Sequence, residues 1–157
     1  MASRRQPSSD LGILLLVAYQ SFVRELHADM AQHGFDDLGS SDGVVMRVLS
    51  RQSRTVSALA SLLGITPQGT AQIVADMERR GYVERRRDPS DARARLVELS
   101  SRGRAAIAVA AAFHRSYEKS LVRQHGTDTV EALRAVLAGM ADDATGSLDR
   151  ELRALYL

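Results

Sequence analysis

The feature that most constrains the fold of this 157-residue chain is a pair of short helical segments separated by a very short turn. The first begins at Thr55 and keeps apolar residues at helical spacing until Gly64, the residue type that most often follows a helix end. Thr66 is a favourable N-cap for the second, and Pro67 occupies a first-turn position that tolerates proline. Gly81 ends this second helix. The arrangement predicts a helix-turn-helix, whose second helix can enter a DNA major groove by its N-terminal end.

A basic β-hairpin is predicted directly after these two helices. Val83 on one side, and Val97 and Leu99 on the other, are apolar positions of two short strands, separated by the turn-forming residues 88–91, Asp-Pro-Ser-Asp. Residues 79–95 contain seven arginines and three acidic residues, a local net charge of +4, which leaves −2 for the rest because the whole chain carries +2. Such a concentration of positive charge favours a polyanionic partner, and a hairpin behind a helix-turn-helix predicts a winged helix.

The rest of the chain is predicted to be helical. A helix is expected from Asp10 to about Gly34, and a second begins at a cap within residues 40–42. Behind the hairpin, an alanine-rich helix is expected from Ser100 or Ser101 to about Gly126, followed by a last helix that Thr127 caps. An apolar stripe continues through Leu148, Leu152, Leu155 and Tyr156, and the polar residues 1–9 are expected to form a flexible arm.

Composition excludes several classes of function. A hydrophobic content of 45% is enough for a core, and the absence of cysteine removes disulfides and thiolate chemistry. The apolar run Ile13–Val17 is too short to span a bilayer and Asp10 is a poor flank for a signal peptide, so a soluble cytoplasmic protein without a membrane partner is expected. No catalytic triad order, phosphate loop or metal motif is present, so we expect neither an enzyme nor a cofactor. The four histidines, at positions 27, 33, 114 and 125, have no compact ligand spacing, which favours structural roles over a metal site.

The predicted DNA contacts follow from these elements. Gln68 and Gln72 can match base edges in a major groove, while the small Gly69 and Ala71 allow the backbone to approach DNA closely. The recognition-helix candidates are therefore Thr66, Pro67, Gln68, Gly69, Ala71 and Gln72. The wing candidates are Arg85, Arg86, Arg87, Asp91, Arg93 and Arg95, although at least one of the three consecutive arginines is expected to be ordinary solvated charge. Thr55 and Ser57 either cap their helix only or also contact phosphate.

Two stretches resemble the MarR family of transcriptional regulators, and the resemblance extends over nearly the whole chain. They are LASLLGITPQGTAQIVADMERRGYVERR, residues 59–86, and DPSDARARLVELSSRG, residues 88–103. The second stretch matches the family's Asp-x-Arg-(Ala/Gly) and then Leu-(Thr/Ser)-x-x-Gly at Asp91, Arg93, Ala94, Leu99, Ser100 and Gly103. In that family the wing arginine enters the minor groove and the preceding aspartate helps to hold it, roles that fall on Arg93 and Asp91.

The resemblance implies a mainly α fold with a small β-hairpin wing, in which a winged helix-turn-helix domain is joined to N- and C-terminal dimerisation helices. The expected domains are a flexible arm at 1–9, a dimerisation helix at 10–36, the DNA-binding domain at 37–100 and dimerisation helices at 101–157. It also implies a homodimer on a palindromic operator in double-stranded DNA, with binding often relieved by a small molecule.

The function expected from these observations is a sequence-specific, ligand-responsive regulator, and in the first instance a repressor. A small aromatic or amphipathic effector would bind in an apolar cavity for which the candidates are Tyr19, Phe22, His27, Met30 and Met46, each of which could instead be plain core. The alternative is a winged-helix module that uses the basic wing to grip an acidic protein partner.

Overall fold

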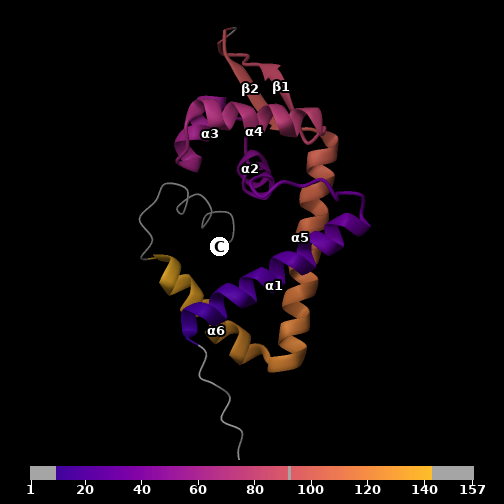
Figure 1. Ribbon diagram of the computed structural model, residues 1–157, viewed down its shortest axis with the longest axis vertical. Helices are drawn as coiled ribbons and strands as arrows, with labels where there is room; N and C mark the ends of the chain where they lie inside the picture. The colour runs from indigo at the N-terminus through magenta and orange to yellow at the C-terminus, as the bar shows by residue number, and fades with distance from the viewer. Residues whose placement is uncertain (1–9, 92, 143–157) are drawn as a thin grey trace, which may run out of the picture. The chain divides into compact units, whose positions relative to one another are not determined.

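The computed structural model describes residues 10–91 and 93–142 and is mainly helical, with one β-hairpin in this part of the chain (Figure 1). The elements are α1 (Leu11–Gln32), α2 (Asp42–Leu49), α3 (Val56–Leu63), α4 (Pro67–Arg79), β1 (Val83–Arg87), β2 (Arg95–Leu99), α5 (Ser101–His125) and α6 (Thr127–Asp142). This confirms the predicted fold class. The expected arm at residues 1–9 and the apolar stripe from Leu148 to Tyr156 lie outside the described residues.

The chain separates into two compact units between Asp36 and Asp37. The first contains α1, which is capped by the Asp10 carboxylate accepting from the Gly12 N–H at 2.7 Å. The second contains α2 to α6 and the hairpin. None of the helices in the described ranges is long and apolar enough to cross a membrane.

The core of the second unit lies among α2, α3, α4 and the hairpin. Its fully buried side chains include Leu59 of α3, Val74 and Met77 of α4, and Val97 of β2. Thr70 is also buried. Its hydroxyl donates to the Thr66 carbonyl at 3.1 Å, so this polar group has a hydrogen-bond partner inside the core. The predicted apolar face of α4 therefore points into this core, which leaves its opposite face for solvent.

Local capping interactions set the bounds of α3 and α4 as the sequence predicts. The Thr55 hydroxyl accepts from the Ala58 N–H at 3.2 Å, and Gly64 turns the chain with φ +67°. The Thr66 hydroxyl accepts from the Gly69 N–H at 3.1 Å. Gly81 leaves α4 with φ +77°, a conformation that glycine adopts without the steric cost of a Cβ.

One predicted cap agrees with the structure in position only, and another differs. Ser41 precedes α2 but makes no side-chain capping bond, and instead the Asp42 carboxylate accepts from the Gly39 N–H at 2.7 Å. Thr127 is the first residue of α6 rather than its cap. The chain turns one residue earlier, where Gly126 has φ +85° and its carbonyl accepts from the Val130 N–H at 3.3 Å.

The hairpin is antiparallel and has a third, very short partner. Val83 pairs with Leu99 and Arg87 with Arg95, so the strands meet in register along their whole length. Arg54, in the loop between α2 and α3, forms a β-bridge with Val97 through hydrogen bonds of 3.0 and 2.7 Å. The helix-turn-helix is thereby attached to the hairpin through the backbone, and the long α5 leads from the hairpin to α6 (Figure 1).

Candidate nucleic-acid interface

The N-terminal end of α4 presents the predicted recognition residues to solvent. Gln68 and Gln72 are exposed and lie one helical turn apart, so their side chains share one face of the helix. Gly69 and Ala71 are half-buried, and Thr66 and Pro67 are exposed at the helix start. Two amide side chains on one face, with small residues between them, are compatible with close approach to base edges.

The start of α3 offers two hydroxyl groups. Thr55 uses its oxygen as an acceptor in the cap, which leaves its O–H proton available to a phosphate. Ser57 is exposed. The cap and a phosphate contact are therefore compatible at Thr55.

The wing tip is built by its two aspartates. Asp88 accepts from the Ser90 N–H at 2.8 Å and from the Ser90 hydroxyl at 2.6 Å, and these bonds lower the pKa of Asp88. Asp91 accepts from the backbone N–H of Arg93 at 2.9 Å, so it fixes the backbone there. The resemblance had implied that Asp91 holds the arginine itself. The bond holds the Arg93 backbone, and a contact of Asp91 with the exposed Arg93 side chain stays a prediction.

The stem arginines divide into two groups. Arg85 forms an ion pair with Glu78 of α4 at 3.4 Å. Arg86 pairs with Glu98 through its Nε and donates to the Ser53 hydroxyl at 3.3 Å. These two residues tie the wing to the rest of the second unit, and neither is simply solvated charge.

The remaining three wing arginines are Arg87, Arg93 and Arg95. All three are exposed, and none has an ion-pair partner within residues 10–91 and 93–142. Arg87 and Arg95 lie directly opposite each other at the outer end of the hairpin. Like charges in such a pair destabilise a hairpin slightly, so the outer wing concentrates positive charge that only an anionic partner would compensate.

An ion pair that sequence reasoning missed holds the C-terminal end of α4. Arg80 donates to the Asp42 carboxylate at 2.5 Å, where the Asp42 side chain is only 3% exposed. It also donates through Nε to Asp76 at 2.9 Å and to the Asp37 carbonyl at 2.6 Å. The bond to Asp42 is the main reason why the pKa of Arg80 is raised. The Asp76–Arg80 spacing of four residues is visible in the sequence, whereas the contact with Asp42 requires the fold.

Tyr82 lies at the centre of an adjacent polar cluster. Its ring is buried and its hydroxyl donates to Asp37; burial first, and then this bond, raise the pKa of Tyr82 to about 12. The same bond lowers the pKa of Asp37. Arg102 of α5 donates to Asp37 at 3.1 Å, and its guanidinium carbon lies 4.8 Å from the Tyr82 ring centroid. The segment before α2, the end of α4 and the start of α5 are thus joined.

Residues 37–94, which comprise the helix-turn-helix and the first half of the wing, match the sequence model described as the MarR family. This region of the chain is therefore of the MarR type. At this coarse level it is a DNA-binding transcriptional regulator with a winged helix-turn-helix, as predicted. No curated protein sequence matches it significantly.

Several solved structures resemble this chain over most of its length. The transcriptional repressor CouR, bound to a 23-mer DNA duplex, is 26% identical, with 90% of this chain and 99% of that chain covered and a TM-score of 0.66. RV1404 from Mycobacterium tuberculosis is 21% identical, covering 90% and 97%, with a TM-score of 0.73. A variant of S. aureus MepR, bound to an oligodeoxyribonucleotide, is 18% identical, covering 85% and 97%, with a TM-score of 0.61. The likenesses to RV1404 and MepR show the fold alone.

The residues predicted to line an effector cavity belong to the two different compact units of this protein. In α1, Tyr19 is 65% exposed, His27 is exposed, Phe22 is half-buried and Met30 is buried. Met46 of α2 is 3% exposed and belongs to the core of the second unit. A cavity formed by these five residues stays a prediction. Across the described ranges, no group of three or more metal-ligating side chains could hold a metal ion.

Proposed function

We propose that this MarR-family chain is a cytoplasmic transcriptional repressor that binds a palindromic operator as a homodimer and is released by a small aromatic or amphipathic effector. The proposal is carried by the exposed Gln68 and Gln72 at the start of α4, a helix that contacts the wing with its uncompensated outer arginines. Amide side chains make bidentate hydrogen bonds with adenine in the major groove, and arginine is drawn into a narrow minor groove. CouR, a repressor bound to DNA, supports the same reading of this fold.

The wing provides the first test. The operator is obtained by selecting bound duplexes from a random pool, and affinity is then measured against salt concentration. We expect Arg93→Ala to weaken operator binding by about 1–3 kcal/mol and to lower the salt slope by roughly one unit per lost contact, because a guanidinium in the groove displaces condensed counterions.

Arg123→Ala is the matched control for this experiment. Arg123 is an exposed arginine of α5, far from the wing in sequence, and its removal should leave the salt slope unchanged. An unchanged affinity and slope for Arg93→Ala would show that the tip is not a DNA contact. If the wild type bound no duplex even at low salt, the alternative function, an acidic protein partner for the wing, would be favoured.

The recognition helix provides the second test. Replacing Gln68 or Gln72 by alanine is expected to relax the preference at one or two base pairs of each half-site by about 1–3 kcal/mol, the usual value of a good bidentate contact. The measurement is affinity across a set of single-base operator variants, with Gln124→Ala of α5 as the control. A loss of equal size on every operator variant would mean that these glutamines only position the backbone.

The proposed dimer is supported by an apolar face of α6 that is exposed among the described residues. Its members recur at helical spacing and are 41–60% exposed: Leu133, Val136, Leu137 and Met140. We expect Leu137→Asp to convert a micromolar dimer to monomer in sedimentation experiments, because a charge would lose its hydration in an apolar contact. Ala135→Asp, on the opposite side of α6, should leave the dimer intact. A wild-type protein that is monomeric at this concentration would contradict the dimer, whose recognition helices should lie about 10 bp apart.

A further inference from the structure

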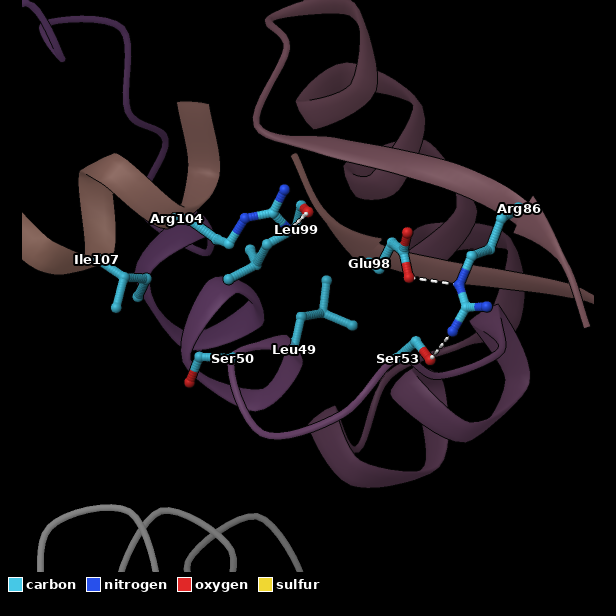
Figure 2. Close-up of a pocket in the computed structure, with 8 residues that line it drawn as sticks. All are labelled: Leu49, Ser50, Ser53, Arg86, Glu98, Leu99, Arg104 and Ile107. Atoms are coloured by element: carbon cyan, nitrogen blue, oxygen red, sulfur yellow. Dashed lines mark hydrogen bonds and ion pairs between the residues drawn. The ribbon is translucent and has the colours of Figure 1, made fainter. Parts of the chain in front are cut away.

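Arg86 forms a side-chain bridge between the wing and the loop that precedes α3. Its Nε donates to the Glu98 carboxylate of β2, and its Nη2 donates to the Ser53 hydroxyl at 3.3 Å. Figure 2 shows the Arg86 side chain with dashed lines to both partners. The bridge lies at the edge of a cavity of about 420 Å³, which Arg104 also lines. One side chain of β1 thus holds β2 and the loop between α2 and α3 together.

The Arg86 bridge is the outermost link from the hairpin to the rest of the second unit among the described residues. One position nearer the base of the hairpin, Arg85 pairs with Glu78 of α4 at 3.4 Å. Beyond the bridge, the side-chain hydrogen bonds of residues 87–91 and 93–95 all stay within the wing. The like-charged arginine pair also lies there, at the outer end of the strands. The direction in which the wing tip points therefore depends on how firmly the stem is held at Arg86.

The strength of the Arg86 bridge suits an orienting role better than a role in folding. The Arg86 side chain is 47% exposed and that of Glu98 is 29% exposed. An ion pair so accessible to solvent shifts an equilibrium by at most about fivefold. The hairpin is independently anchored to the core by the fully buried Val97. Loss of the bridge should therefore leave the protein folded and change only how often the wing points in the observed direction.

We propose that Arg86 is a positioning residue for DNA recognition, which together with Glu98 and Ser53 holds the wing at a fixed angle to α4. At that angle Arg93 enters the minor groove while the glutamines of α4 occupy the major groove. The bridge then sets the number of base pairs between the two contacts, so it contributes to sequence preference without touching a base. Two of the three guanidinium nitrogens of Arg86 are engaged within the protein, which favours this role over a phosphate contact. The inference rests on the proposed function.

Glu98→Gln separates positioning from charge. The substitution removes the ion pair while keeping the shape of the side chain, so we expect operator affinity to fall by up to about fivefold per subunit. If the wing acted through its charge alone, removing one of its acids would instead strengthen DNA binding. Glu118→Gln is the matched control, because it removes the carboxylate that pairs with Arg134 between α5 and α6. It should leave operator affinity unchanged.

A double-mutant cycle tests whether Arg86 acts through Arg93. Arg86→Gln alone should weaken operator binding by up to about fivefold per subunit. In the Arg93→Ala background the same change should cost almost nothing, because the contact that it positions has already gone. Base preference gives a second readout, which a loss of stability would not produce. The preference should relax at the base pairs next to the wing and persist at those that α4 reads.

The operator is the one selected from the random pool, and urea denaturation of the same samples checks that each variant is folded. Unchanged or tighter binding by Glu98→Gln would overturn the positioning role. So would losses for Arg86→Gln and Arg93→Ala that simply add, since Arg86 would then have a DNA contact of its own. Wild-type protein that bound no duplex would contradict the proposed function itself. Either of the first two results in a protein that binds its operator would remove the role of the bridge alone.

Discussion

Gly103→Ala is expected to destabilise the folded protein by roughly 3 kcal/mol or more, because the added methyl group has no space. Gly103 is buried in the first turn of α5, where a Cβ would overlap the Tyr82 carbonyl oxygen and lie 3.1 Å from a Leu99 methyl carbon. That carbonyl cannot move freely, since it accepts from the Ser100 N–H at 3.0 Å. The start of α5 would have to separate from the end of α4, and the core at Tyr82 would open.

Gly139→Ala is the matched control, and urea denaturation of the two variants is the measurement. Gly139 lies in α6 with nothing within 4 Å of its added Cβ. Alanine should therefore stabilise the helix there by up to about 1 kcal/mol, through propensity alone. The two glycine-to-alanine substitutions should therefore change the free energy of unfolding in opposite directions. A Gly103→Ala protein as stable as the wild type would show that the contact with Tyr82 is not close.

Asp42→Ala is expected to cost about 3 kcal/mol of stability, because it leaves the mostly buried Arg80 guanidinium without its most deeply buried anion. The Arg80 side chain is only 17% exposed, so water cannot replace the lost partner well. The substitution also removes the acceptor for the Gly39 N–H at the start of α2. Since Arg80 ends α4, the proposed recognition helix, we expect weaker operator binding in addition to the lower stability.

Asp76→Ala tests whether burial of the ion pair is the reason why losing Asp42 lowers the stability. Asp76 also pairs with Arg80, but its side chain is 40% exposed, and a surface pair contributes at most about 1 kcal/mol. Thermal and chemical denaturation of both variants would give the comparison. Equal losses for Asp42→Ala and Asp76→Ala would mean that the pair with Asp42 is no more protected from solvent than the pair with Asp76.

The sequence by itself determined the elements whose formation depends on neighbours along the chain. Thr55 and Thr66 cap their helices, and Gly64 and Gly81 end them, because a cap involves atoms only a few residues apart and a positive φ favours glycine wherever it occurs. The order of these signals, with the turn and arginines of the hairpin behind them, was enough to predict the winged helix, and the resemblance of residues 59–86 and 88–103 indicated the family. Thr127 shows the limit of this reasoning, since a one-residue shift in the turn moved it into α6.

Only the tertiary structure decided which charges are free and which are engaged. Seven arginines between residues 79 and 95 look alike in the sequence, yet Arg80 is held by Asp42, which is 38 residues away, and Arg86 by Ser53, which is 33 residues away. The same holds for the cavity beside Arg104, whose lining spans residues 49–107. A guanidinium can pair with any carboxylate that the fold brings within reach, so its partner depends on chain packing, and packing is a property that no local pattern of residue types encodes.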